Sequence, residues 1–249
     1  MAGHSKWKQI KRKKAVTDSR RAQAWTKLIR EITVAAKAGG GDAGGNPRLR
    51  KAIDDAKAAN MPNENIDRAV KKGTGELAGV SYEEVTYEGY GPGGTAILVE
   101  ASTDNANRTV AEIRHAFSRN NGNLGATNSV AWMFDRKGMI AIPAGKIPEE
   151  TAMNDALEAG AADFVVDGDL YIVTSEPNTF HAVIDRLKAK GYQPESSEIE
   201  MVARNVVKLH AADAQKLLQL IDVLEELEDV SKVFTNLDVD ALELEEAGA

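Results

Sequence analysis

The chain has 249 residues, of which 43% are hydrophobic, and its 31 Lys and Arg against 38 Asp and Glu give a formal net charge of -7. This length and hydrophobic content support two or three packed domains and exclude disorder throughout. The absence of cysteine excludes disulfides and thiolate chemistry. No apolar run approaches the roughly 18 residues that span a bilayer, and the N-terminal lysines are not followed by the apolar stretch of a secretory signal. We therefore expect a cytoplasmic protein without membrane attachment.

Charge is distributed unevenly along the chain. Residues 1–73 hold 18 Lys and Arg against 7 Asp and Glu, a balance of +11, whereas the remainder holds 13 against 31, a balance of -18. A basic segment carried on acidic domains is typical of proteins that bind polyanions. Phosphate repels the acidic remainder, which would therefore orient the molecule instead of binding.

The basic segment begins with an arm and a long helix. Residues 1–17 are predicted to form a basic arm, because GHSKWKQIKRKK at 3–14 has almost no periodic apolar face. From Asp18, apolar residues follow a 3.6-residue period and predict an amphipathic helix whose inner arc contains Trp25, Leu28, Ile29, Ile32 and Ala36. Four cations fall on the opposite arc, which predicts a solvent-facing basic stripe of Arg20, Lys27, Arg30 and Lys37.

Two shorter helices are predicted after the glycine-rich loop at 39–45, and they complete a helical basic domain over residues 18–78. Asn46 and Pro47 provide an N-cap and a proline at the first helical position of the second helix. Asn63 is expected to cap the third helix, and Gly73 is expected to end it.

Beyond this domain the pattern predicts an α+β fold, in which the three-helix module is followed by two ferredoxin-like α/β domains. The order βαββαβ over 138–204 predicts a domain inserted into a discontinuous domain of 79–137 plus 205–240. In the discontinuous domain, a strand at 96–101, a helix at 107–121 and a strand at 130–134 are predicted. They are joined by a strand at 205–209, a helix at 213–228 and a strand at 233–237. Residues 241–249 form an acidic tail. The alternative is a linear string of smaller units.

Phosphate contact is the strongest functional prediction, because each neutralised phosphate releases counterions. The alternative for the arm is a solvated tail, and Trp7 either stacks on a base or docks on the helical module. Three cations lie at the start of the second helix, where they oppose its dipole, which favours a functional reason for them. The predicted nucleic-acid-binding residues are Lys6, Trp7, Lys8, Lys11, Arg12, Lys13, Lys14, Arg20, Arg21, Lys27, Arg30, Arg48, Arg50 and Lys51.

Other chemistry is not indicated by the sequence. GYGPGG at 89–94 precedes a strand instead of a helix and therefore predicts a tight turn, not a phosphate loop. The polar turn at 103–108 enters a helix, where capping and anion binding both fit. The four histidines are far apart, so we predict no metal site, and we predict no catalytic residue, cofactor or small-molecule substrate. A nucleic-acid enzyme would need clustered carboxylates, and near the basic module the sequence offers only Asp42, Asp54, Asp55 and Asp67.

Four runs of residues resemble the YebC/PmpR family: GHSKW at 3–7, MPNENIDRAVKKG at 61–73, YEGYGPGG at 87–94 and TDNANRT at 103–109. The resemblance spans the whole chain. It implies a helical N-terminal domain, two α/β domains and a cytoplasmic DNA-binding regulator of transcription, with no catalytic residue. Because the family includes the mitochondrial translational activator of cytochrome c oxidase, the resemblance also implies an alternative. In that alternative the protein binds RNA on the ribosome, including ribosomal RNA and tRNA, and relieves stalling at proline-rich sequences.

The sequence leaves the choice between DNA and RNA open. Phosphate contacts position a protein without identifying its polymer, and basic arms suit folded RNA as well as duplex DNA. The glycine-rich break between the first two helices is longer than the turn of a helix-turn-helix motif, so no base-reading element is predicted.

Overall fold

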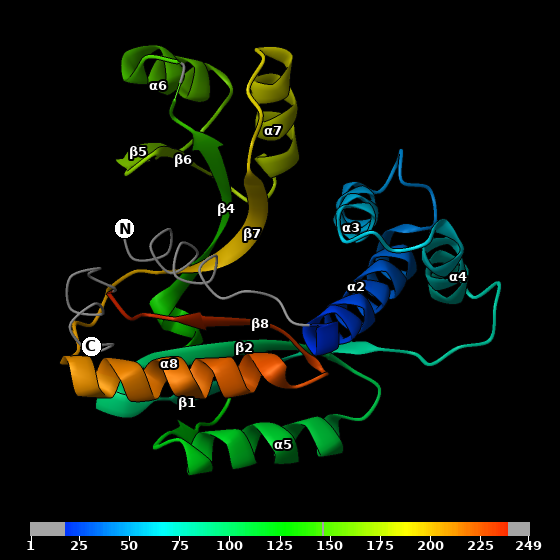
Figure 1. Cartoon of the computed structure of the whole chain (residues 1–249), viewed down its shortest axis with the longest axis vertical. Helices are drawn as coiled ribbons and strands as arrows, with labels where there is room; N and C mark the ends of the chain where they lie inside the picture. Colours follow the sequence, from blue (N-terminus) through cyan, green and yellow to red (C-terminus); the bar gives the residue numbers. More distant parts are fainter. Residues whose placement is uncertain (1–17, 146, 239–249) are drawn as a thin grey trace. The chain divides into compact units, whose positions relative to one another are not determined.

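The computed structural model describes residues 18–145 and 147–238 (Figure 1). These residues form α-helices and two four-stranded antiparallel sheets. The predicted basic arm at 1–17 and the acidic tail at 241–249 lie outside the described residues.

The described chain divides into two compact units. One unit contains residues 18–131 together with His210–Thr235, and it holds the helical module and the first sheet. The other unit contains Trp132–Leu209 with residues 236–238, and it holds the second sheet. The first unit is therefore discontinuous in sequence.

The helical module consists of α2 (Asp18–Gly39), α3 (Pro47–Ala58) and α4 (Asn63–Thr74). The apolar arc predicted for the first helix is confirmed, because Ile32 and Ala36 are buried while Trp25, Leu28 and Ile29 pack against the same core. The indole of Trp25 also donates to the carbonyl of Ala59 at 3.1 Å. The core is completed from α3, α4 and the turn between them by Leu49, Ala52, Ala56, Met61, Ile66 and Ala69.

The start of α3 agrees with the sequence prediction, whereas both ends of α4 differ from it. The side chain of Asn46 accepts a hydrogen bond from the amide of Leu49 at 3.1 Å, as predicted for an N-cap. Asn63 is instead the first residue of α4, whose cap position is held by Pro62 without a side-chain hydrogen bond. The helix also continues past Gly73, and Gly75 ends it with a φ of 83°.

The first sheet has the strand order β3-β1-β2-β8, and helices α5 and α8 contact each other beside it (Figure 1). A glycine at 89 is required in β1, because a Cβ there would lie 2.7 Å from the Phe117 ring of α5. The elements are β1 (Glu83–Tyr90), β2 (Ala96–Thr103), α5 (Ala106–Arg119), β3 (Asn123–Leu124), α8 (Ala211–Glu226) and β8 (Val230–Thr235).

Two of the strands predicted for this sheet are wrong. The predicted strand at 205–209 forms only a single bridge, between Val207 and Leu237. The strand expected at 130–134 is replaced by a 3-10 turn at Ala131–Met133, because the buried Glu88 carboxylate accepts from the amides of Asn128, Val130 and Ala131, each at 2.7 Å. The sheet therefore runs ββαβ and then αβ along the chain, with the GYGPGG segment forming the predicted turn between its first two strands.

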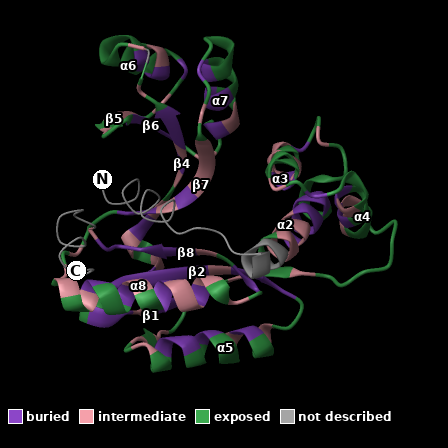
Figure 2. Ribbon diagram, in the orientation of Figure 1, coloured by how far each residue is buried: buried purple, intermediate pink, exposed green. Residues whose placement is uncertain are grey.

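The second sheet follows the predicted βαββαβ order, with strands arranged β5-β6-β4-β7. Its helices α6 and α7 contribute to one apolar core with Ile140, Tyr171 and Val173. Figure 2 shows buried segments, in purple, in β4 and α7. The elements are β4 (Phe134–Pro143), α6 (Glu149–Glu158), β5 (Asp163–Asp167), β6 (Leu170–Ser175), α7 (Phe180–Ala189) and β7 (Ser196–Ala203).

The predicted fold class is confirmed. Strands β4 to β7 lie in the sequence between β3 and β8, so one α/β domain is inserted into the other after an N-terminal helical module.

A Gly73→Ala substitution is expected to lower the free energy of unfolding by about 1 to 2 kcal/mol. A Cβ at this position would lie 2.4 Å from the carbonyl oxygen of Thr33, and backbone cannot move aside cheaply, so overpacking outweighs the gain of about 1 kcal/mol in helix propensity. Gly45→Ala is the matched control, since its nearest contact is 3.6 Å, and its effect should stay within about 0.5 kcal/mol. Equal urea midpoints for both variants would contradict this packing.

Candidate nucleic-acid interface

The polar side of α2 is only in part the solvent-facing stripe that the sequence predicts, because Lys37 is exposed whereas Arg30 is buried. Arg30 is only 7% exposed, so that prediction is wrong for this residue. Lys27 donates to the carbonyl of Glu225 at 2.6 Å, and Lys37 donates to the hydroxyl of Ser81 at 2.7 Å. These three cations therefore already have partners inside the first unit.

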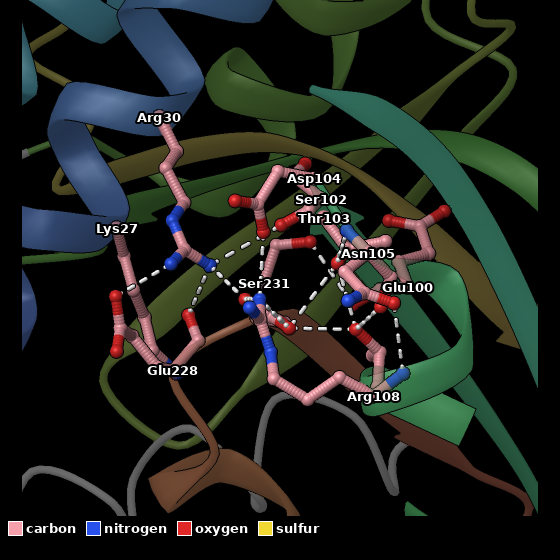
Figure 3. Close-up of polar contacts among 12 residues, drawn as sticks. Lys27, Arg30, Glu100, Ser102, Thr103, Asp104, Asn105, Arg108, Glu228 and Ser231 are labelled. Carbon is pink, nitrogen blue, oxygen red and sulfur yellow. Dashed lines mark hydrogen bonds and ion pairs between the residues drawn. The ribbon is translucent and has the colours of Figure 1, made fainter. Parts of the chain in front are cut away.

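Arg30 is held by the segment that joins α8 to β8 (Figure 3). Its two terminal nitrogens contact the carboxylates of Asp229 and Glu228, each at 2.5 Å. It also donates to the carbonyl of Ser102 in β2 at 3.3 Å, and its guanidinium lies 5.3 Å from the ring centre of Tyr82. The helical module is thus fastened to the first sheet by a buried charge.

Asp229 is the centre of this network and is only 3% exposed. Besides Arg30, its carboxylate accepts from Arg108 at 2.8 Å, from the hydroxyl of Thr109 at 2.6 Å and from the hydroxyl of Thr103 at 3.2 Å. Burial raises the pKa of Asp229, but the hydrogen bonds from Thr109, Arg108 and Arg30 outweigh burial and leave the pKa below its usual value. The carboxylate is therefore held in its charged form.

Local backbone features place Asp229 at the N-terminus of α5. The pairing of β2 with β8 shifts register between Glu100 and Ala101, and such an irregularity re-aims the residues beside it. Asn105 caps α5 by accepting from the amide of Arg108 at 3.1 Å. The sequence of the turn at 103–108 fits both helix capping and anion binding, and the structure shows capping. The anion beside this helix end is the carboxylate of Asp229.

The three cations at the start of α3 differ in whether they have an acidic partner. Arg48 pairs with Glu31 of α2 and with Glu84 of β1, both at 2.7 Å, and these hydrogen bonds raise its pKa. Lys51 pairs with Asp55 one turn further along the helix, at 2.7 Å. Only Arg50 is exposed without an ion pair to a residue in the described ranges.

Four exposed cations of the helical module remain available to a ligand. Arg50 and Lys57 lie seven residues apart on α3 and so share one face, while Lys71 and Lys72 end α4. None of the four forms an ion pair with a described residue. Sequence reasoning missed Lys57, although its spacing from Arg50 was a usable signal. For Lys71 and Lys72, a favourable contact with the helix dipole and a ligand site both fit the sequence.

The remaining predicted residues are not placed by the structure. Arg20 and Arg21 belong to α2, but their side chains are outside the described part of the chain. The arm residues also lie outside it: Lys6, Trp7, Lys8, Lys11, Arg12, Lys13 and Lys14.

The charge balance shows where the basic excess is concentrated. Residues 18–78 hold 12 Lys and Arg against 8 Asp and Glu, a balance of +4, and several of those cations are ion-paired. Residues 1–17 hold 6 Lys and Arg and no Asp or Glu. In the sequence, the largest excess of basic over acidic residues is thus in residues 1–17.

Neither a metal centre nor a membrane span is found in the described ranges. Among residues 18–145 and 147–238, no group of three or more His, Asp or Glu side chains is arranged to hold a metal ion. No helix in the same ranges is both long and apolar enough to cross a bilayer.

Comparison with known proteins gives matches over nearly the whole chain. Residues 5–76 match the model of the TACO1/YebC protein N-terminal domain, and residues 82–237 match the TACO1/YebC second and third domain. The chain belongs to the TACO1/YebC family. The resemblance inferred from the four sequence runs is thereby confirmed.

Relatives in the TACO1/YebC family carry regulatory names. A probable transcriptional regulatory protein from Gemmatimonas aurantiaca is 57% identical over 96% of this chain and 97% of its own length. A second, GSU1074 from Geobacter sulfurreducens, is 51% identical over 98% of this chain and 99% of its own. The crystal structure of a conserved hypothetical protein, Aq1575, from Aquifex aeolicus is similar with a TM-score of 0.82 and 45% identity, covering 92% of this chain and 94% of that one. The names of the two curated relatives thus describe probable regulators of transcription.

In this TACO1/YebC family member, Asp229→Asn is expected to lower the free energy of unfolding by about 3 kcal/mol or more. The substitution leaves the buried Arg30 guanidinium without its one buried counter-charge in the described residues, since Glu228 is exposed, and an undercompensated buried charge is strongly destabilising. Glu64→Gln, which removes an exposed pair with Arg68, should change stability by less than about 1 kcal/mol. Chemical denaturation of both variants measures the difference, and a similar small loss for each would contradict the importance of the buried pair.

The charge on Asp229 should make the free energy of unfolding depend on pH. Because the fold lowers the pKa of Asp229, its contribution to stability is fully present above the unfolded pKa of about 3.9 and is lost as pH falls through the lower folded pKa. The free energy of unfolding of Asp229→Asn should therefore decline less steeply below about pH 4 than that of the unmodified chain. Parallel decline of the two proteins would show that Asp229 does not contribute.

Proposed function

We propose that this protein is a non-catalytic regulator of transcription that binds duplex DNA by phosphate contacts from its basic N-terminal region. The observation that carries the proposal is the separation of charge. Six cations of residues 1–17 have no acidic neighbour in their own segment, and the chain beyond residue 73 has a balance of -18. The arm is therefore the part of the chain best suited to a polyanion.

The structure refines which residues support this proposal. Lys27, Arg30, Arg48 and Lys51 belonged to the predicted site, but each has an intramolecular partner that phosphate would have to displace. Arg50, Lys57, Lys71 and Lys72 are exposed and add positive charge to the module. We therefore assign the main phosphate contacts to the arm and secondary ones to these four residues.

Binding of this kind would be largely independent of base sequence. Phosphate contacts carry no sequence information by themselves. The connection at 40–46 between α2 and α3 is longer than the three or four residues that join helices in a helix-turn-helix motif. Sequence selection, where it occurs, would then depend on DNA shape or on a partner protein.

DNA is proposed as the polymer because the curated relatives are named probable transcriptional regulatory proteins. The alternative is RNA on the ribosome, which the same cations suit. Parallel binding to duplex DNA and structured RNA across a salt series, with cosedimentation of ribosomes, separates the two. Retention of duplex DNA at about 0.15 M salt without ribosome association supports the proposal, and the reverse result would replace it with a role in translation.

Neutralising four arm cations, by changing Lys11, Arg12, Lys13 and Lys14 to Gln, is expected to weaken DNA binding and to flatten its salt dependence. The slope of log K against log salt should fall by about 3 to 4 if each cation contacts a phosphate, at about 0.9 per contact. Fluorescence anisotropy with a labelled duplex at several salt concentrations measures this slope.

The matched control removes four exposed cations elsewhere, by changing Arg114, Arg119, Arg136 and Lys188 to Gln. It alters the net charge by the same amount but leaves the arm and helical module intact. If the control lowers the slope as much as the arm variant does, binding depends on overall charge and the assignment to the arm fails.

A further inference from the structure

The inserted domain exposes apolar side chains on helix α6 and strand β5. Met153 and Leu157 of α6 are 38% and 51% exposed, and Val166 of β5 is 42% exposed. Single exposed apolar residues are ordinary, whereas a group of them on adjacent elements indicates a surface that binds a partner. We call these three residues the apolar edge patch.

The α6 part of the patch faces away from α7. Met153 and Leu157 each follow a buried alanine of the helix by one residue, which is about 100° around its axis. Asp155 lies on the opposite flank, where its carboxylate accepts from the hydroxyl of Tyr192, just after α7, at 2.7 Å. Because α7 occupies that flank and α6 lies over β5 and β6, Met153 and Leu157 are on the flank nearest the outer edge of the sheet (Figure 1).

The β5 part of the patch lies beside the start of α6. Strand β5 is at the end of the strand order β5-β6-β4-β7, so among the described residues one side of it has no neighbouring strand. Val166 is opposite the core residue Tyr171 of β6, which places its side chain on the face that α6 covers. The hydroxyl of Tyr171 donates to the carbonyl of Ile147 at 2.7 Å, and this bond holds the start of α6 beside Val166.

The backbone of β5 can accept a further strand. A two-residue turn joins β5 to β6, so the residues that flank it, Asp167 and Leu170, form a hydrogen-bonded pair. Bonded and non-bonded pairs alternate, which directs the backbone groups of Phe164 and Val166 to the open edge. In agreement, the N–H of Phe164 donates to the carboxylate of Asp163 at 2.9 Å. An edge of this kind pairs readily with an extended chain.

Carboxylates lie at both ends of the patch. Glu149 and Glu150, in the first turn of α6, are exposed, and neither forms an ion pair with a described residue. Asp163 lies at the other end, where a short connection joins α6 to β5, and within the described ranges its carboxylate is bonded only by the adjacent amide. The inserted domain, 138–204, holds 5 Lys and Arg against 12 Asp and Glu, a balance of -7. A ligand of this surface should therefore be basic.

We propose that the apolar edge patch and the open side of β5 bind an extended, basic segment of a partner protein, which adds to the four-stranded sheet as a further strand. Alternate side chains of that segment would be apolar and cover the patch. One cation would lie beside Asp163, and another would lie beside Glu149 and Glu150. This docking does not rest on the proposed function.

A second copy of this chain and a nucleic acid both fit the edge less well. Twofold pairing of β5 with itself, centred on Val165, would set Asp163 of each copy opposite Asp167 of the other, and like charges directly opposite each other are destabilising. Phosphate is repelled by the acidic domain as a whole. A basic strand from another protein meets neither obstacle.

Binding is tested by nuclear magnetic resonance on the isotopically labelled, full-length chain, titrated with the end-blocked synthetic peptide Lys-Val-Thr-Val-Lys. The amide resonances of 163–167, Met153 and Leu157 should shift in a saturable way, whereas those of α7 should not. The matched peptide Glu-Val-Thr-Val-Glu should cause no saturable shift. Absence of saturation with the lysine peptide, or equal shifts with both peptides, would overturn the proposal.

Hydrogen exchange tests whether the peptide adds as a strand. The amide of Val166 should exchange more slowly when the peptide is bound, because its N–H gains an acceptor. The amide of Val165, which the alternation directs to β6, should change little. Unchanged exchange at Val166 in the saturated complex would rule out strand addition.

Substitutions in the patch test its apolar part. Leu157→Lys with Val166→Lys should weaken binding of the lysine peptide by about tenfold or more, because it removes apolar contact area and adds like charge. The matched control is Leu77→Lys with Val206→Lys, at positions that are 42% and 44% exposed elsewhere, and it should stay within about twofold of the unmodified chain. Equal affinities of the two variants would contradict the assignment to this edge.

Charge variants test the acidic ends. Changing all three carboxylates should weaken binding by about three- to tenfold and flatten its salt dependence, since exposed ion pairs are weak and screened. The variant carries Glu149→Gln, Glu150→Gln and Asp163→Asn. Its control changes three exposed carboxylates elsewhere: Asp54→Asn, Glu112→Gln and Asp185→Asn. An equal loss in both variants would show that only net charge matters and would remove the specific role of the ends.

Other occupants would be recognised by the same resonances. Shifts at 163–167 on dilution of the protein alone would identify a second copy and overturn the proposal. Saturable shifts there with duplex DNA, and none with the lysine peptide, would identify nucleic acid and overturn it as well. Failure of the peptide to bind would leave the proposed function intact, because DNA binding is assigned to the basic N-terminal region.

Discussion

The buried ion pair between Arg30 and Asp229 is the constraint on which the first unit depends. A guanidinium taken out of water is stable only when counter-charges and hydrogen-bond acceptors surround it, and Asp229, Glu228 and the carbonyl of Ser102 supply them. The pair joins α2 to a segment 199 residues later in the chain. The helical module and the discontinuous α/β domain are consequently parts of one unit.

This constraint also determines which cations can serve a ligand. Lysines and arginines on the helices are partly occupied by the fold itself, in pairs such as Arg48 with Glu31 and Lys51 with Asp55. The arm has no acidic residues of its own. A regulator built in this way would bind polyanions mainly through the arm, while its acidic domains, which phosphate repels, would orient it.

The fold was largely predictable because its signals are local. The apolar period of α2, the cap at Asn46 and the βαββαβ order of the inserted domain each depend on neighbouring residues. The candidate site was predictable only in part, because the burial of Arg30 depends on a partner remote in sequence. The strand predicted at 130–134 was wrong for a related reason: Glu88, some forty residues earlier, binds the amides that a strand would have used.

The most direct test of the account is to map which residues touch bound nucleic acid. Formaldehyde crosslinking of the full-length chain to duplex DNA, followed by mass spectrometry, identifies the contacting lysines. The account predicts crosslinks at Lys6 to Lys14, with weaker ones at Lys57, Lys71 and Lys72, and none at the internally bonded Lys27 or Lys51. Crosslinks confined to Trp132–Leu209, or strongest at Lys27 and Lys51, would contradict it.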